Sequence, residues 1–186
     1  NEIAQSEAAN GKEFAKYWMH NAFLNIDNKK MSKSLGNFFT VRDISEKYDL
    51  QVLRFFMLSA HYRSPLNFSA DLMEAAKNGL ERIITGVENL KYAISVTDKE
   101  AMDESEKALV EEAKKFITKF DEAMDDDFNT ADAISAIFEL IKFANTNGIP
   151  TQPTTDRILL YSQDSQELSV AQAGLELAIL LPQPHR

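Results

Sequence analysis

The sequence of 186 residues contains no cysteine and has only 6 glycines and 5 prolines. Without cysteine it has no disulfide, no thiol nucleophile and no cysteine-based zinc site of its own. It lacks any apolar run near the ~20 residues that cross a bilayer, and the segment Asn1–Ala4 lacks the charged and then apolar pattern of a signal peptide. No initiator methionine is present. We therefore expect an internal piece of a longer, soluble, cytoplasmic protein with no membrane partner.

What is present is typical of a globular chain, with 44% hydrophobic and 26% charged residues. The net charge of −9 is unevenly distributed. Residues 1–65 carry 9 basic and 7 acidic side chains, whereas residues 66–148 carry 9 and 18. A polyanionic partner is therefore expected to meet the first part of the chain.

Helical periodicity dominates the middle of the sequence. Apolar residues recur at three- and four-residue steps in three stretches, which predicts three amphipathic helices. These stretches are Leu72–Ile94, Leu109–Met124 and Ile134–Ile141. Ser69 is the expected N-cap of the first helix, and Asn129 or Thr130 begins the third. Because each apolar stripe needs a partner, we expect a helical bundle over residues 66–147.

The pattern upstream of the bundle is mixed, and it predicts the end of an α/β domain over residues 1–40 and connecting helices over residues 41–65. The individual elements expected are a helix over Gly11–His20, a strand over Ala22–Ile26, a polar turn over Asp27–Lys30, and helices over Val41–Tyr48 and Leu50–Ala60. Thr40 and Asp43 have the spacing of a capping box for the first of these two helices. Residues 148–186 begin with a proline-containing linker and are expected to form a divergent, partly disordered tail with one helix over residues 167–181.

The segment richest in chemical information is Lys30–Asn37, which reads KMSKSLGN. Two lysines three residues apart flank small hydroxyl residues, so the loop can bring two mobile cations and several hydrogen-bond donors around a polyphosphate. Preorganised cations stabilise the charge that develops on a departing pyrophosphate. The alternative is an ordinary solvated turn, since most exposed lysines bind nothing.

The string at residues 30–34 resembles the KMSKS signature of class I aminoacyl-tRNA synthetases, and its surroundings narrow the resemblance to the cysteinyl-tRNA synthetase family. Five further blocks occur in the order of that family: Asn1–Ala8, Tyr17–His20, Asp49–Arg54, His61–Ser69 and Ala123–Thr130. The resemblance covers roughly residues 1 to 147. It implies a mainly α fold, in which the end of a class I catalytic α/β domain is followed by a helical bundle.

The resemblance also implies a reaction, the ATP-dependent joining of L-cysteine to tRNA(Cys) through a cysteinyl-adenylate, with Mg²⁺ accompanying ATP. Lys30 and Lys33 would be the catalytic residues that contact the phosphates and the leaving pyrophosphate, and Lys33 is the stronger candidate. The further ATP-binding residues that it implies are Met31, Ser32 and Ser34. Gly36 would allow the turn, and Asn37 would hold it.

The same family binds the substrate thiolate through a zinc ion held by two cysteines, a histidine and a glutamate. The glutamate of that set falls on Glu2, whose alternative role is a surface carboxylate at a helix start. The other ligands are absent from this chain, so the zinc site is incomplete. The HIGH half of the family is also absent, and we therefore expect the isolated chain to be inactive.

Other residues carry weaker expectations. Arg54 and Arg63 are candidate tRNA contacts, although Arg54 is equally compatible with an interior ion pair or a side chain that extends along apolar surface. Trp18 and His20 either border a substrate pocket or simply pack. The run Asp125–Asp127 is expected to be a solvated helix cap rather than a magnesium site.

Two alternatives to a monomeric tRNA synthetase remain at this point. One is the related cysteine ligase of the mycothiol pathway, which has the same loop but joins cysteine to an amino sugar. The other is a non-catalytic helical module that binds RNA or a protein partner.

Overall fold

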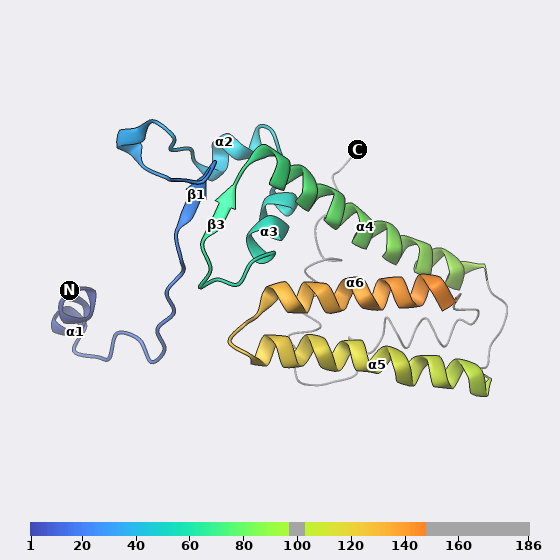
Figure 1. Ribbon diagram of the computed structural model, residues 1–186. Helices are drawn as coiled ribbons and strands as arrows, with labels where there is room; N and C mark the ends of the chain where they lie inside the picture. Colours follow the sequence, from blue (N-terminus) through green and yellow to red (C-terminus); the bar gives the residue numbers. More distant parts are fainter. Residues whose placement is uncertain (97–102, 148–186) are drawn as a thin grey trace.

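The structure is a computed structural model in which residues 1–96 and 103–147 are described. Three long helices lie side by side with a small sheet at one end, and a short helix at the N-terminus lies apart from them (Figure 1). The elements are α1 (Glu2–Asn10), β1 (Leu24–Ile26), β2 (Lys29–Lys30), the 3₁₀ helix η1 (Lys33–Leu35), α2 (Val41–Ser45), α3 (Leu50–Leu58), β3 (Leu66–Phe68), α4 (Ala70–Ser95), α5 (Glu104–Asp125) and α6 (Thr130–Asn147). The expected fold class is confirmed.

The sheet has the strand order β2–β1–β3, in which β1 pairs antiparallel with β2 and parallel with β3. Asp27 and Asn28 form the turn between β1 and β2 with φ values of 48° and 61°. Asp and Asn accept this left-handed conformation more readily than other non-glycine residues. The N–H of Asn28 donates to the side-chain oxygen of Asn67 at 2.7 Å, which ties the hairpin to β3. The expected polar turn is thus shorter than predicted, since its two lysines form β2.

β3 lies where the sequence suggested the junction between the connecting helices and the bundle. It pairs with β1 in the register Leu24↔Leu66, Asn25↔Asn67 and Ile26↔Phe68. The Phe68 ring also packs against Phe39 and Phe56, with centroid separations of 4.9 and 5.8 Å. The chain therefore returns to the sheet after α2 and α3, and α4 begins directly from this strand.

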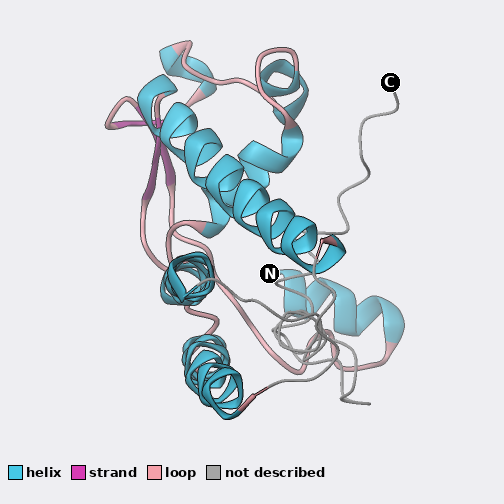
Figure 2. Cartoon of the chain, turned by 90° about the vertical axis from the view of Figure 1, so that its right-hand side faces the viewer, coloured by secondary structure: helices cyan, strands magenta, loops and turns pink. Residues whose placement is uncertain are grey.

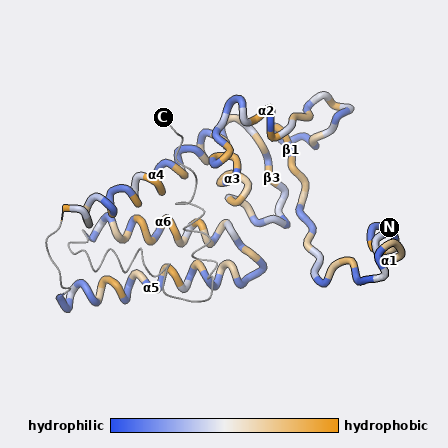
Figure 3. Tube along the Cα trace, turned by 180° about the vertical axis from the view of Figure 1, so that it is seen from behind, coloured by the Kyte–Doolittle hydropathy of each residue, from blue (hydrophilic) through white to orange (hydrophobic). Residues whose placement is uncertain are grey.

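Much of the core of the bundle comes from the apolar stripes predicted from the sequence, although Leu72 is exposed and Met73 is fully buried in its place. α3 and α4 share one cluster of buried side chains: Val52, Leu53, Phe56, Met73, Ala76 and Leu80. Two smaller clusters rely on small residues. Ala113 and Ala144 pack against Leu90 and join α4, α5 and α6, whereas Ala133 and Ala136 pack against Phe120 and join α5 to α6. Figure 2 shows the molecule turned by 90°, so that two of the long helices are seen nearly along their axes, and Figure 3 shows apolar and polar residues alternating along the long helices.

The predicted caps are confirmed. Thr40 and Asp43 form a reciprocal capping box at the start of α2. Ser69 Oγ accepts from the N–H of Leu72 at 3.3 Å, and Asn129 Oδ1 accepts from the N–H of Asp132 at 3.2 Å. The hydrogen bond from the backbone of Thr40 lowers the pKa of Asp43. Each cap satisfies a backbone donor that the helix cannot.

The predicted helix over Gly11–His20 is wrong. The helix lies one segment earlier as α1, and Gly11 ends it with φ 62° while its N–H donates to Glu7 O at 2.8 Å. This left-handed glycine cap stops the helix, so the residues that follow run as extended chain toward β1 (Figure 1). The helix and tail expected beyond residue 147 lie outside the described residues. Within the described ranges, no helix is both long and apolar enough to span a membrane.

At Gly86, α4 packs against α6 with no room for a side chain. A Cβ at this position would overlap Ile141 Cγ2, whereas a Cβ at Gly79 would lie 3.1 Å from the edge of the Phe55 ring. We predict that Gly86→Ala lowers the free energy of unfolding by about 1–3 kcal/mol, because the two helix backbones must separate. Gly79→Ala is the control and should change it by at most about 1 kcal/mol, since better helix propensity offsets the tight contact. Urea unfolding followed by circular dichroism measures both, and equal stability of both variants would contradict the close packing.

Asp121 on α5 is disfavoured in its charged form. Burial and then the neighbouring charge of Asp125 raise the pKa of Asp121. An acid whose pKa is higher in the folded state loses stability as pH rises through its titration range. We therefore expect Asp121→Asn to raise the melting temperature at pH 7 and to have little effect at pH 3, where the carboxyl is protonated in both states. An equal gain at both pH values would exclude this electrostatic cause.

Candidate functional site

The Lys30–Asn37 loop is closed by a single side chain. Asn37 Oδ1 accepts from the N–H of Ser32 at 2.9 Å, and Asn37 Nδ2 donates to the carbonyl of Lys30 at 3.1 Å. The carboxamide thus bridges both flanks of the loop, and it uses its acceptor and its donor at once. The expected role of Asn37 in holding the turn agrees with this geometry.

Inside this closure the chain makes one tight turn. η1 ends at Gly36, which has φ 67° and donates to Lys33 O at 3.2 Å. Glycine suits this conformation because it has no Cβ to clash with the backbone. The hydroxyl oxygens of Ser32 and Ser34 lie 2.7 Å apart. The loop is therefore shaped by its own polar groups, and it projects away from the long helices (Figure 1).

Both loop lysines are exposed and carry no counter-charge. Within residues 1–96 and 103–147, no carboxylate lies within ion-pair distance of either ammonium. Each rests on an aromatic face, Lys30 Nζ at 5.5 Å from the Phe23 centroid and Lys33 Nζ at 5.3 Å from the Phe38 centroid. A ring holds a cation without neutralising it. Both charges are therefore available to an anionic ligand.

Glu2, the expected metal ligand, has no set of further metal ligands around it within the described residues. Glu2 is exposed in the first turn of α1, and no group of three or more histidine, aspartate and glutamate side chains in the described part of the chain could hold a metal ion. One carboxylate in a chain without cysteine does not satisfy the four ligands that zinc prefers. The residues present therefore do not fit the zinc site that the resemblance implies.

Trp18 and His20 are brought together on the extended segment before β1. Their rings stack with a centroid separation of 6.4 Å, and Trp18 also contacts Phe14 at 5.5 Å. Trp18 remains 48% exposed. The two residues therefore form a local aromatic cluster rather than part of the buried core.

The two candidate tRNA contacts are in different situations. Arg54 is exposed on α3 and has no carboxylate partner among the described residues, so the interior ion pair considered for it is wrong. Arg63 instead binds Asp127, with Nε 2.8 Å from Oδ2, and donates to the Tyr62 hydroxyl at 2.9 Å. The hydrogen bond with Tyr62 and the charge of Asp127 raise the pKa of Arg63.

The sequence predicted a solvated helix cap for the run Asp125–Asp127 and gave no indication that Asp127 binds Arg63. The blocks His61–Ser69 and Ala123–Thr130 both contribute to the family resemblance, and the ion pair joins them across the fold. The occurrence of both blocks in one sequence was the signal that could have indicated this contact, but their spacing along the chain gave no reason to place them together in the fold.

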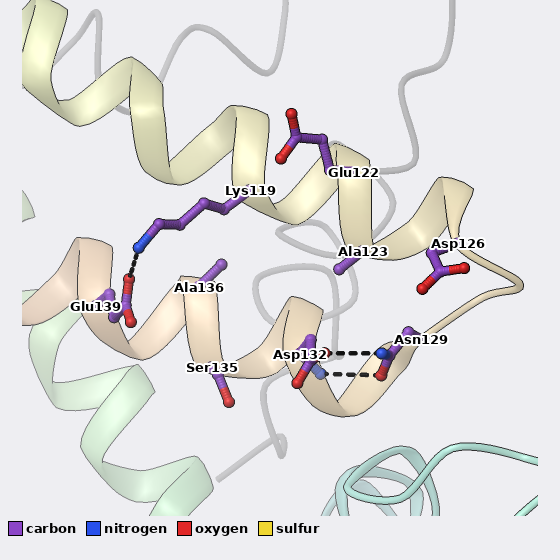
Figure 4. Close-up of a pocket in the computed structure, with 9 residues that line it drawn as sticks. All are labelled: Lys119, Glu122, Ala123, Asp126, Asn129, Asp132, Ser135, Ala136 and Glu139. Atoms are coloured by element: carbon purple, nitrogen blue, oxygen red, sulfur yellow. Dashed lines mark hydrogen bonds and ion pairs between the residues drawn. The ribbon is translucent and has the colours of Figure 1, made fainter.

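A cavity of about 390 Å³ opens between α5 and α6. Its lining carries four carboxylates and one lysine among nine residues: Lys119, Glu122, Ala123, Asp126, Asn129, Asp132, Ser135, Ala136 and Glu139. Its lysine is paired with Glu139 at 2.6 Å, and Asp132 is bonded to Asn129 (Figure 4). The surplus of carboxylates makes this cavity unsuitable for a polyphosphate.

Comparison with known proteins gives several relatives at high identity. The chain is 70% identical over 147 residues to the cysteine–tRNA ligase of Lachnospira eligens, a match that covers 79% of this chain and 31% of the relative. The chain belongs to the cysteine–tRNA ligase family. The ligases of Lachnoclostridium phytofermentans and Clostridioides difficile are 61% and 58% identical, over 78% and 79% of this chain and 32% of each relative. The chain thus spans about a third of the length of these cysteine–tRNA ligases.

Family profiles divide this member of the cysteine–tRNA ligase family in two. The class I (C) tRNA synthetase catalytic domain matches residues 1–78, and the DALR domain matches residues 119–176. The second match extends past Asn147, into the tail that was expected to diverge.

A solved structure with a similar fold is the ternary complex of Agrobacterium radiobacter K84 agnB2 LeuRS with tRNA and LeuAMS. It has a TM-score of 0.65 and 18% identity, over 95% of this chain and 25% of that chain. At this identity the likeness concerns the fold alone.

We predict that Asn37→Ala opens the loop while Asn37→Asp keeps half of its closure. Alanine removes the acceptor for the Ser32 N–H, whereas aspartate retains it and loses only the donor to Lys30. A hydrogen bond of this kind contributes about 1 kcal/mol, so deuterium exchange at the Ser32 amide should accelerate roughly fivefold in Asn37→Ala and much less in Asn37→Asp. Ser34→Ala is the control, because it leaves the Ser32 N–H bonded. Equal exchange in the Asn37→Ala and wild-type chains would show that Asn37 does not close the loop.

Proposed function

We propose that this chain is a part of a cysteine–tRNA ligase and contributes the loop that binds the triphosphate of ATP. The observation that carries the proposal is the pair of exposed ammonium groups on a self-closed loop, with no carboxylate to neutralise them among the described residues. The names of the relatives support the reaction class.

The reaction proposed begins with adenylate formation. A carboxylate oxygen of L-cysteine attacks the α-phosphorus of ATP, the bond from that phosphorus to the bridging oxygen breaks, and pyrophosphate leaves. Lys30 and Lys33 stabilise the charge that grows on the leaving group, since fixed cations act most strongly where charge develops. The hydroxyls of Ser32 and Ser34 and the backbone at Met31 shape the loop around the nucleotide. Positioning supplies much of the remaining rate.

The partners follow from this reaction. They are ATP with Mg²⁺, L-cysteine and tRNA(Cys). The ligase would act on them as a monomer in the cytoplasm. Among the candidate RNA contacts we favour Arg54, because its guanidinium is exposed and unpaired within the described residues, whereas Asp127 engages Arg63. A phosphate contact by Arg54 would contribute to affinity without reading sequence.

The competing functions find less support. The mycothiol-pathway cysteine ligase would share the loop, but the three relatives described above, at 58–70% identity, are named cysteine–tRNA ligases. A non-catalytic helical module would not need two unpaired lysines on a closed loop. RNA binding without any effect of the lysines on activity would favour that module.

The decisive experiment uses a chimera in which residues 1–147 replace the homologous segment of the Lachnospira eligens ligase. We expect cysteine-dependent ATP–pyrophosphate exchange in the chimera, and Lys33→Ala should lower its kcat about 100-fold, in line with the loss of one preorganised charge contact. Lys29→Ala is the matched control, because Lys29 is an exposed lysine on β2 that lies just outside the loop.

The control should stay within about twofold of the unmodified chimera. Equal exchange rates for Lys33→Ala and Lys29→Ala would overturn the catalytic assignment. If the chimera transferred cysteine to an amino sugar and not to tRNA, the mycothiol-pathway reaction would be favoured instead.

A further inference from the structure

The turn between α5 and α6 is joined to the segment before β3 through the carboxylate of Asp127. The Tyr62 hydroxyl donates to Oδ1 at 2.7 Å, and Arg63 donates from Nη2 to Oδ1 at 3.2 Å and lies with Nε 2.8 Å from Oδ2. His61 Nε2 lies 3.7 Å from Oδ2. One carboxylate therefore binds two consecutive side chains, Tyr62 and Arg63, and lies close to a third, which uses its capacity as a multiple acceptor.

The backbone of this turn is held in an unusual conformation. Asp127 and Phe128 have φ values of 57° and 55°, a region that non-glycine residues seldom occupy. Two consecutive residues of this kind persist only where their surroundings hold them. Backbone hydrogen bonds from Phe128 to Met124 at 3.1 Å and from Asn129 to Ala123 at 3.0 Å provide that support. The turn thus adopts a strained backbone conformation in which the Asp127 carboxylate faces the neighbouring segment.

The same segment is fastened on its other side to the strand that leads to the loop. The carbonyl of Tyr62 accepts from the N–H of Ala22 at 2.8 Å, and the N–H of Leu66 donates to Phe23 O at 3.1 Å. The ring of Phe23 then supports the ammonium of Lys30. A continuous series of contacts therefore runs from the α5–α6 turn to the lysine-bearing hairpin.

α6 also packs on α4, which begins just after β3, but among the described residues the other polar link between the α5–α6 hairpin and this region is weak. Thr130 Oγ1 donates to Ala60 O at 3.4 Å, and the core clusters of the hairpin contain no residue from the sheet. The charged contact at Asp127 is the stronger of these two polar connections, because charge-assisted hydrogen bonds exceed neutral ones.

We propose that Asp127 is a positioning residue that sets the α5–α6 hairpin relative to the sheet carrying the Lys30–Asn37 loop. The proposal rests on the proposed function for its catalytic consequence. A tRNA is a large and fairly rigid ligand, so a ligase that touches it with two parts needs those parts in a fixed relation. A displacement of about 1 Å far from the chemistry can cost roughly 100-fold in rate.

The first test measures geometry in the full 186-residue chain. Because the sequence has no cysteine, spin labels can be attached at Lys29→Cys on β2 and Glu122→Cys on α5 alone. Pulsed EPR should give one narrow distance distribution in the parent chain and a clearly broadened or shifted one in Asp127→Asn, which loses the charge and one acceptor oxygen. Tyr62→Phe should give a smaller change.

Asp126→Asn is the matched control, since it makes the same chemical change one residue earlier, at a carboxylate without a bonded partner within the described ranges. Its distance distribution should equal that of the parent. An unchanged distribution in Asp127→Asn, or the same broadening in Asp126→Asn, would overturn the proposal.

The second test separates positioning from a general loss of fold in the chimera. Asp127→Asn should leave ATP–pyrophosphate exchange within about twofold, because exchange needs no tRNA, while kcat/KM for tRNA charging falls about tenfold. Equal losses in both steps, or no loss in charging, would refute the positioning role. Failure of the proposed function is distinguishable, because it would remove exchange from the unmodified chimera as well.

Discussion

The parallel pairing of β1 with β3 is the constraint on which the rest of the structure depends. It spans only three residue pairs, Leu24↔Leu66 to Ile26↔Phe68. At the end of this pairing where Ile26 lies beside Phe68, β1 continues into the hairpin that carries the loop and β3 continues into α4. A one-residue slip would turn Phe68 away from Phe39 and Phe56, because successive strand residues face opposite sides of a sheet. A very short strand is thereby anchored by aromatic packing.

Polar side chains fix the local conformation of the hairpin turn and of the loop, whose positions the strand pairing determines. The amides of Asn67 and Asn37 each replace a backbone partner, one at the hairpin turn and one across the loop. Hydrophobic packing has no comparable role at the loop, where Lys33, Ser34 and Leu35 are all exposed. The shape of the loop is therefore set by hydrogen bonds, and that of the bundle by buried apolar area.

Elements with a strong local signal could be predicted from the sequence. The long helices follow from apolar spacing, and their first residues from Ser69, Asn129 and the Thr40–Asp43 pair. The lysine loop was recognisable because its residue types are unusual together. The helix over Gly11–His20 was misplaced, because a glycine is compatible with either side of a helix boundary until its φ is known. β2 and β3 were missed since strands of two or three residues have no periodicity to detect.

Contacts between distant segments were beyond sequence reasoning. Nothing in three successive aspartates distinguishes Asp127, which meets Arg63 from 64 residues away. The separate aromatic supports of Lys30 and Lys33 were equally hidden, because Phe23 and Phe38 lie outside the recognised string. These supports have an energetic consequence. Two like charges on one short loop repel each other, and an aromatic ring attracts a cation without cancelling its field. The binding of a polyanion would therefore relieve the repulsion between the two ammonium groups.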